Sequence, residues 1–252
     1  MDLELRDKVA IVAGGSRGIG RAIALGLAAE GCHLALAARS ADKLAETARE
    51  AEALGVRTVT IPGDLTDADA CRRVVESTAG AFGRVDILVT SVHISLRGTD
   101  EATWQQAMES LFLLPVRLQD LAAAQMRMQG SGVILHLSSI WGREAGGHPA
   151  YNAAKAALIS HIKSSADALA RANIRVVSVA PGSTSHPGGT WWRRQQEDPE
   201  GMARFVQENI PLGRFGTAEE IANVAVFLCS PRASWVTGST VVVDGGQSRS
   251  NL

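Results

Sequence analysis

Short apolar runs alternate along the chain with longer segments in which apolar residues recur every three or four positions. The runs are five to seven residues long, which is typical of buried strands, and the segments between them have the period of helices. The predicted strands are residues 8–13, 33–38, 57–61, 85–90, 133–137, 174–180 and 239–243, and the helices include 41–54, 68–82, 104–127, 151–171 and 218–228. Continuous apolar strands that alternate with helices predict a parallel sheet covered on both faces.

Two places interrupt this alternation. Pro115 falls inside the helix predicted at 104–127, and we expect it to bend that helix rather than divide the domain. From about residue 183 to 210 the pattern gives way to polar, irregular sequence that carries the adjacent Trp191 and Trp192. Long irregular insertions at the edge of a sheet are commonly lids or binding loops. We therefore expect a substrate lid here, with the tryptophans either facing substrate or packing at a subunit contact.

The first predicted strand runs directly into a glycine-rich turn, which is followed by a helix. Glycines let the backbone approach a diphosphate closely, and the start of a helix offers free N–H groups. The spacing is Gly-x3-Gly-x-Gly rather than the common Gly-x-Gly-x2-Gly. The residues expected to contact a dinucleotide here are Gly14, Ser16, Arg17, Gly18, Ile19 and Gly20. The turn favours a Rossmann-type doubly wound parallel sheet. Because the sequence contains no internal repeat, linker or low-complexity segment, we expect a single α/β domain over residues 1–252.

The tips of the second and third strands carry the residues that bear on cofactor choice. An acidic residue about 20 positions after the glycines selects NAD by binding the adenosine ribose. This chain has Arg39 there, which can pair with a 2′-phosphate while Arg17 closes the other side, unless it is simply a solvated charge. We therefore predict NADP(H). Asp64 either accepts a hydrogen bond from adenine or caps the following helix.

The segment from Ser138 to Lys155 is the candidate catalytic site. Tyr151 and Lys155 are four residues apart at the start of a helix, so they share a face. A nearby cation lowers the pKa of a tyrosine from about 10, and activity near neutral pH needs a shift of about three units in a pocket of low dielectric constant. Tyr-x3-Lys also occurs by accident in helices. The assignment therefore depends on the glycine turn, Arg39 and Pro181-Gly182 that accompany it.

Composition excludes several classes of protein. The chain is 46% hydrophobic and 20% charged with a net charge of −1, and it has no block of Lys and Arg to attract nucleic acid or an anionic membrane. Cys32, Cys71 and Cys229 are scattered singly, so we expect neither a disulfide framework nor a metal site. No apolar run approaches the roughly 18 residues of a membrane span. A cytoplasmic protein is predicted.

Together these motifs resemble the short-chain dehydrogenase/reductase family over nearly the full length of the chain. The matching positions are Gly14, Gly18, Gly20, Asp64, Ser139, Tyr151, Lys155, Pro181-Gly182 and residues 243–246. Residues 211–216 are similar to the 3-oxoacyl-[acyl-carrier-protein] reductase-like branch. The resemblance implies an oxidoreductase that transfers a hydride between NADP(H) and a carbonyl or secondary alcohol, with a 3-oxoacyl thioester or a small ketone as substrate.

The resemblance also implies roles for particular residues. Tyr151 would be the general acid/base, Ser139 would hold the substrate oxygen, and Lys155 would bind the nicotinamide ribose. Ser138 competes for the serine role, but the family's serine precedes a residue pair and a glycine, as Ser139 does. Further cofactor contacts are expected at Leu65, Thr90, Tyr151, Lys155, Pro181, Gly182 and Thr184, and substrate contacts at His93, Arg143, His186 and Trp191. A homotetramer built through the helices 104–127 and 151–171 and the C-terminal segment is implied as well.

The chain also departs from the family pattern. Ala13 replaces a threonine, residues 90–93 replace Asn-Asn-Ala-Gly, and His186 replaces the threonine that holds the nicotinamide amide. Leu111 stands where the family has an asparagine that holds a proton-relaying water, so Ser110 or another water path substitutes, or turnover is slow. These departures motivate an alternative: an NADP(H)-binding protein with weak or no turnover that serves as a sensor or an oligomer partner.

Overall fold

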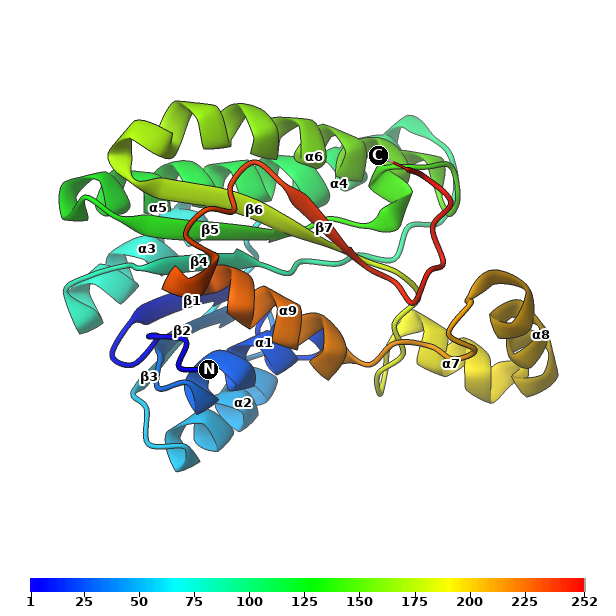
Figure 1. Ribbon diagram of the computed structural model, residues 1–252, viewed down its shortest axis with the longest axis horizontal. Helices are drawn as coiled ribbons and strands as arrows, with labels where there is room; N and C mark the ends of the chain where they lie inside the picture. Colours follow the sequence, from blue (N-terminus) through cyan, green and yellow to red (C-terminus); the bar gives the residue numbers. More distant parts are fainter. Residues whose placement is uncertain (252) are drawn as a thin grey trace.

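The computed structural model describes residues 1–251, and its centre is one seven-stranded sheet in the order β3-β2-β1-β4-β5-β6-β7 (Figure 1). Every neighbouring pair of strands is parallel. The strands are β1 Val9–Ala13, β2 His33–Ala38, β3 Thr58–Pro62, β4 Ile87–Thr90, β5 Gly132–Leu137, β6 Ile174–Pro181 and β7 Thr240–Val243. The chain moves outward from β1 to β3 and then returns to place β4 on the other side of β1. This doubly wound order confirms the predicted fold.

Helices cover both faces of the sheet (Figure 1). One layer consists of α1 (Gly18–Ala29), α2 (Ala41–Ala53) and α9 (Ala218–Cys229), and the other of α3 (Ala68–Phe82), α5 (Leu114–Gln129) and α6 (Pro149–Leu169). In β1, Ala10 and Val12 pack into the first layer, while Ile11 and Ala13 pack into the second. Successive side chains of a strand point to opposite faces, so a strand that is buried on both faces must be apolar throughout.

The helix predicted at 104–127 is divided into three parts. It consists of α4 (Glu101–Met108), a π-helical turn (Glu109–Leu113) and α5. Pro115 lies in the first turn of α5, directly after the π-helical turn, and the residues that flank that turn, Met108 and Leu114, keep right-handed helical backbone angles. The irregularity comes just before it, in the wider π turn, which accommodates an additional residue within the helix.

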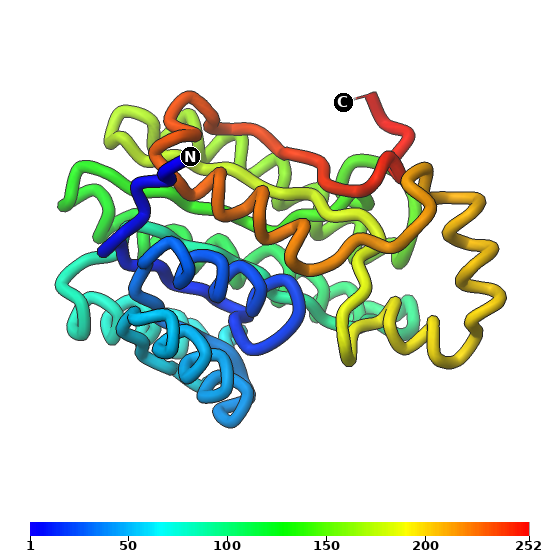
Figure 2. Tube along the Cα trace, turned by 60° about the horizontal axis from the view of Figure 1, so that its bottom comes forward, coloured from blue at the N-terminus to red at the C-terminus, as the bar shows by residue number. Residues whose placement is uncertain are grey.

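The segment predicted to be irregular between residues 183 and 210 is mostly helical. It contains α7 (Thr190–Glu197) and α8 (Pro199–Asn209), with Asp198 between them accepting a hydrogen bond from the backbone N–H of Gly201 at 2.9 Å. Both views show the two helices standing apart from the layers that cover the sheet (Figures 1 and 2). Neither helix contains a fully buried residue, which explains why the apolar pattern of the sequence did not predict them.

Candidate active site

A large cavity opens at the carboxyl ends of the strands, with a volume of about 1450 Å³. Its walls come from the glycine turn after β1, the tips of β2 and β3, the loop after β4, the end of β5, the start of α6 and the segment from β6 to α7. Ligands of open α/β sheets bind at this edge, where the strand order reverses. The cavity exceeds the usual size of a site for one small molecule, and it can hold a dinucleotide together with a substrate.

The structure brings almost all the predicted site residues to this cavity. Those that line it are Gly14, Ser16, Arg17, Gly18, Ile19, Gly20, Arg39, Asp64, Leu65, His93, Ser139, Tyr151, Lys155, Pro181, Gly182, Thr184, His186 and Trp191. Two predicted residues do not line it. The side chain of Thr90 is buried, with Oγ1 2.7 Å from Nδ1 of His136, and Arg143 lies in the turn that follows Gly142.

The glycine turn crosses the end of β4 at a distance that only glycine permits. Gly14 has a φ of +91°, and a Cβ there would lie 2.3 Å from the carbonyl oxygen of Ser91. A Cβ on Gly20 would lie 2.2 Å from the carbonyl oxygen of Gly14. The turn therefore packs on itself and on the β4 loop without side chains, and the start of α1 faces the cavity with its N–H groups. A diphosphate fits such a cradle.

Basic side chains surround the cavity at the tips of β2 and β3. Arg39 is exposed here, and Lys43 from the first turn of α2 joins it. Asp64 accepts hydrogen bonds from the N–H and the hydroxyl of Thr66 at 3.0 and 2.9 Å, and these bonds lower its pKa more than the charge of Arg39 does. The cap of α3 is Asp67 rather than Asp64. Lys43 was not among the predicted site residues, although it lies only four residues after Arg39 in the sequence.

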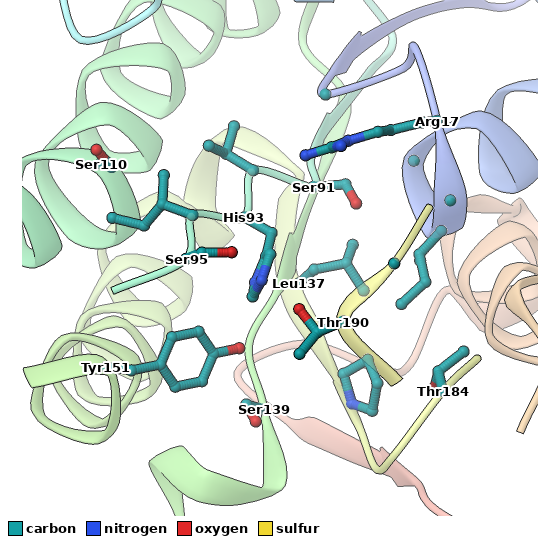
Figure 3. A pocket seen from close by; sticks show the side chains of 18 of the residues that line it. Arg17, Ser91, His93, Ser95, Ser110, Leu137, Ser139, Tyr151, Thr184 and Thr190 are labelled. Carbon is teal, nitrogen blue, oxygen red and sulfur yellow. The ribbon is translucent and has the colours of Figure 1, made fainter. Parts of the chain in front are cut away.

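Tyr151 and Lys155 come from the first turns of α6, and both line the cavity. Figure 3 shows the Tyr151 side chain extending from this helix. The Lys155 side chain is buried, and its Nζ donates a hydrogen bond to the carbonyl oxygen of Leu137 at 2.6 Å. Burial lowers the pKa of Lys155 to about 8 because the ammonium loses its hydration. Nζ lies 5.8 Å from the centre of the Tyr151 ring.

The pKa of Tyr151 is raised above its ordinary value, not lowered as we predicted. Burial of the phenol is the main cause, and a hydrogen bond with Ser139 opposes it to a smaller extent. The Lys155 ammonium is itself partly neutral near pH 8 and is directed at the carbonyl oxygen of Leu137, so it does not offset the loss of hydration. Tyr151 therefore carries its proton at neutral pH.

The two candidate serines have different surroundings. The Ser138 hydroxyl donates to the carbonyl oxygen of Val179 at 3.0 Å and lies 3.2 Å from the Ser178 hydroxyl, so it is part of the sheet. The Ser139 hydroxyl accepts a hydrogen bond from the N–H of Trp141 at 3.2 Å and also interacts with Tyr151. The geometry favours Ser139 for a role beside Tyr151.

Aromatic rings form the wall next to Tyr151. The Trp141 ring meets the Tyr151 ring edge-on with centroids 6.3 Å apart, and Trp191 lies 6.4 Å from Trp141. Trp191 also stacks on Phe205 of α8 at 4.8 Å and packs against Phe215 at 5.4 Å. Of the two adjacent tryptophans, Trp191 faces the cavity and anchors α7 and α8 beside it. Trp141, which the sequence analysis did not select, joins this wall.

The loop between Ser139 and α6 is tied to the C-terminal segment. The carboxylate of Glu144 accepts hydrogen bonds from the backbone N–H groups of Arg249 and Ser250 at 2.8 and 2.9 Å. Two residues before Arg249, Oε1 of Gln247 accepts a hydrogen bond from the N–H of Ser183 at 2.7 Å. The end of the described chain therefore holds both the loop before Tyr151 and the start of the segment that carries α7.

The departures from the family pattern have distinct structural surroundings. Leu111 is fully buried in an apolar cluster with Ala107, Ala150 and Ala154, whereas its neighbour Ser110 reaches the cavity from the π-helical turn. His186 lies directly over the glycine turn, because a Cβ on Gly18 would come within 2.5 Å of its Nε2. Within residues 1–251 no cluster of side chains could hold a metal ion, and no helix is long and apolar enough to cross a membrane.

Comparison with known proteins gives three kinds of match. Residues 13–248 match the family described as enoyl-(acyl carrier protein) reductase. The 3-oxoacyl-[acyl-carrier-protein] reductase FabG of Staphylococcus aureus strain Mu50 is 35% identical, over 95% of this chain and 97% of its own. The structure of L-sorbose reductase from Gluconobacter frateurii complexed with NADPH and L-sorbose is 37% identical, with a TM-score of 0.94 over 99% of this chain and 100% of its own. A 7α-hydroxysteroid dehydrogenase complexed with NADH is 28% identical, with a TM-score of 0.90 over 99% of this chain and 97% of its own.

Proposed function

Because the chain belongs to the short-chain dehydrogenase/reductase family, in its 3-oxoacyl-[acyl-carrier-protein] reductase-like branch, we propose that it transfers a hydride between NADP(H) and a carbonyl or secondary alcohol of a small molecule. The observation that carries the proposal is the joint placement of Ser139, Tyr151 and Lys155 in the cavity that the glycine turn closes at its other end. A protonated phenol, a hydroxyl and a buried amine in one pocket suit the reduction of a carbonyl group.

In this proposal each residue has a task that its surroundings support. Nicotinamide, when bound, supplies or accepts the hydride at its C4. Ser139 holds the substrate oxygen by a hydrogen bond next to Tyr151. Tyr151 donates its proton to that oxygen during reduction and takes it back during oxidation, and its raised pKa keeps the proton in place until then. Lys155, fixed by the carbonyl oxygen of Leu137, binds the ribose hydroxyls of the cofactor.

The test of this function is NADPH oxidation with a panel of small ketones, ketoses and 3-oxoacyl thioesters. We expect turnover by the parent protein and a loss of at least about a hundredfold in Tyr151→Phe, the scale of a lost general acid. NADPH binding and the circular dichroism spectrum serve as controls that the variant is folded. If Tyr151→Phe reduces substrate as fast as the parent, the role of Tyr151 is wrong.

NADP(H) is the proposed cofactor because Arg17, Arg39 and Lys43 are among the basic residues that line the cavity. A cationic wall favours the extra phosphate of NADP(H) over the ribose hydroxyl of NAD(H). Arg39→Asp should reverse the preference for NADPH over NADH. Arg49→Asp introduces the same charge change on an exposed part of α2 outside the cavity and should not. An unchanged NADPH/NADH ratio in Arg39→Asp would contradict the assignment.

A second candidate is an NADP(H)-binding protein with weak or no turnover. The specific observation in its favour is Leu111, which lies in an apolar cluster and offers no ligand for a relayed water. Tight NADPH binding without turnover across the whole substrate panel would support this candidate over the first.

We also propose a homotetramer in the cytoplasm. Trp104, Leu113 and Met128 are 39%, 38% and 75% exposed on α4, the π-helical turn and α5, which provides apolar surface for a neighbouring subunit. The three cysteines are free and buried, which is compatible with a reducing compartment. Light scattering after size-exclusion chromatography measures the mass, and a monomer would contradict the tetramer.

A further inference from the structure

His93 stands in the part of the cavity where the substrate of the proposed reaction would lie. It follows β4 in the loop that replaces the family's Asn-Asn-Ala-Gly, at the position of the glycine. Its imidazole meets the Tyr151 ring edge-on, with centroids 6.0 Å apart and an angle of 66° between the planes. Figure 3 shows His93, Ser95, Ser139, Tyr151 and Thr190 around this side of the cavity.

The charge state of His93 follows from its surroundings. Although the ring is accessible within the cavity, protein atoms surround it closely, and this loss of hydration lowers its pKa to about 4. The positive charges of Lys155, Arg17 and His186 lower the pKa further in the same direction. His93 is therefore neutral at physiological pH, with one ring nitrogen that donates and one that accepts a hydrogen bond.

The hydrogen-bonding capacity of this ring is not used within the protein. Among residues 1–251, no side chain or backbone group forms a hydrogen bond with either nitrogen of His93, although it contacts the ring of Tyr151. His136, which is fully buried, differs in this respect because each of its nitrogens has a partner, Thr90 for Nδ1 and Gln119 for Nε2. An imidazole that faces a cavity with both nitrogens unpaired is suited to bind a polar group of a ligand.

On the basis of the proposed function, we propose that His93 determines substrate specificity. Its imidazole forms a hydrogen bond with a hydroxyl on the carbon next to the reacting carbonyl, so the substrates are hydroxy ketones. In a hydroxy ketone of this kind, the carbonyl oxygen and the hydroxyl oxygen lie about one hydrogen-bond length apart when they are gauche. When Tyr151 and Ser139 hold the carbonyl oxygen, the hydroxyl comes to the side of Tyr151 where the His93 imidazole lies. Ser95 and Thr190 extend the same polar wall toward further hydroxyls.

Two other roles for His93 fit the structure less well. A general base near neutral pH needs a pKa close to the working pH, and about 4 is too low for efficient proton transfer. A purely space-filling role would not require ring nitrogens, and a phenylalanine would serve it equally. Replacement of His93 by phenylalanine therefore distinguishes a space-filling role from hydrogen bonding.

The experiment compares two ketones of equal size, acetoin and methyl isopropyl ketone, which differ in having a hydroxyl or a methyl next to the carbonyl. We expect kcat/KM of the parent to favour acetoin at least about tenfold, because a site that is built to bind a hydroxyl rejects the analogue that lacks it. His93→Phe keeps the ring and removes its nitrogens, so the ratio should fall toward one. His93→Gln retains a donor and an acceptor and should keep part of the preference.

Three results would overturn the proposal. The first is a parent protein that shows no preference between the two ketones. The second is a His93→Phe variant that retains the parent's ratio. The third is a Ser95→Ala variant that abolishes the ratio while His93→Phe does not, which would transfer the role to Ser95.

Failure of the proposed function is distinguishable from failure of this inference. If the parent turns over no member of the whole substrate panel, the proposed function fails, and His93 is then tested by binding. Turnover of other members of the panel without turnover of acetoin would overturn this inference alone. Saturation-transfer NMR on the NADPH-saturated protein should show acetoin bound to the parent and not to His93→Phe. Equal binding of acetoin to both proteins, or to neither, would overturn the inference.

Discussion

His136 of β5 and Thr90 of β4 are paired neighbours in the sheet, and Nδ1 of His136 lies 2.7 Å from Oγ1 of Thr90. The other ring nitrogen of His136 lies 3.0 Å from Oε1 of Gln119. The amide nitrogen of Gln119 in turn lies 2.9 Å from both His161 Nε2 and Ser165 Oγ. A polar network thus runs from the tip of β4 through the layer of α5 and α6, and it draws the Thr90 side chain away from the cofactor cavity.

This network makes folding stability dependent on pH in the acid range. Burial, followed by the charges of His161 and Lys155, lowers the pKa of His136 to about 3. Below about pH 6.5, His136 binds a proton in the unfolded chain but not in the folded protein. His136 therefore does not reduce the free energy of unfolding above that pH, and it reduces this free energy increasingly as the pH falls toward 3. A group of this kind changes the free energy of unfolding by up to about 1.4 kcal/mol per pH unit.

His136→Gln should therefore be less stable than the parent at pH 7 but should lose less stability on acidification. Urea unfolding at several pH values from about 7 to 4.5 measures both effects. Thr78→Val, which removes a buried hydroxyl that donates to the carbonyl oxygen of Val74 but no titratable group, is the control and should retain the parent's pH dependence. An equally steep loss in His136→Gln and the parent would contradict the prediction.

Ser139→Ala and Ser138→Ala should separate catalysis from stability. Removing the Ser139 hydroxyl takes a hydrogen bond from the reacting oxygen, so we expect kcat to fall by roughly a hundredfold. Removing the Ser138 hydroxyl breaks its bond to the Val179 carbonyl within the sheet, so we expect about 1 kcal/mol of lost stability with turnover largely kept. Steady-state kinetics and urea unfolding on both variants provide the comparison. The reverse pattern would assign the catalytic role to Ser138.

Gly20→Ala should impair cofactor binding, because its Cβ would collide with the Gly14 carbonyl oxygen and force the turn apart. Isothermal titration with NADPH should show at least about a tenfold weaker Kd. Gly80→Ala in α3 is the matched control, since a Cβ there meets nothing within 4 Å. That variant should bind NADPH normally and gain about 0.5–1 kcal/mol of stability. Unchanged affinity in Gly20→Ala would show that the turn tolerates a side chain.

Leu111→Asn restores the residue type that the family pattern has at this position, yet we expect it to destabilise the protein. Leu111 is completely buried among alanines, and an amide placed there without partners costs about 1–3 kcal/mol. Leu113→Asn lies in the same π-helical turn but is 38% exposed, so it should change stability by less than about 0.5 kcal/mol. Urea unfolding distinguishes the two. Equal stability of Leu111→Asn and the parent would mean that the turn can repack around the amide.

The parts of the fold that sequence predicted well are those where one physical requirement dominates. A strand such as β1, buried on both faces, must be apolar throughout, and Gly20 has no alternative in its turn. Tyr151 and Lys155 share a face because helix geometry requires it. For these features the local sequence is sufficient.

The remaining features depend on contacts between distant segments. The helices α7 and α8 bury no residue completely, so they leave little apolar periodicity, and Trp191 reveals its direction only through Phe205 and Phe215. The inward orientation of Thr90 depends on His136, which lies 46 residues away in sequence. The raised pKa of Tyr151 reflects its burial, which no spacing of residues can reveal.

The bonds from Glu144 to the backbone of Arg249 and Ser250 have a practical consequence for work on this protein. The loop that leads to Tyr151 is held by the main-chain N–H groups of these two residues, and proline is the one residue type that could not donate these bonds. These two bonds therefore depend on the path of the backbone at Arg249 and Ser250. A purification tag on the amino terminus leaves these two bonds undisturbed, whereas a tag fused directly after Ser250 would lie beside the loop that leads to Tyr151.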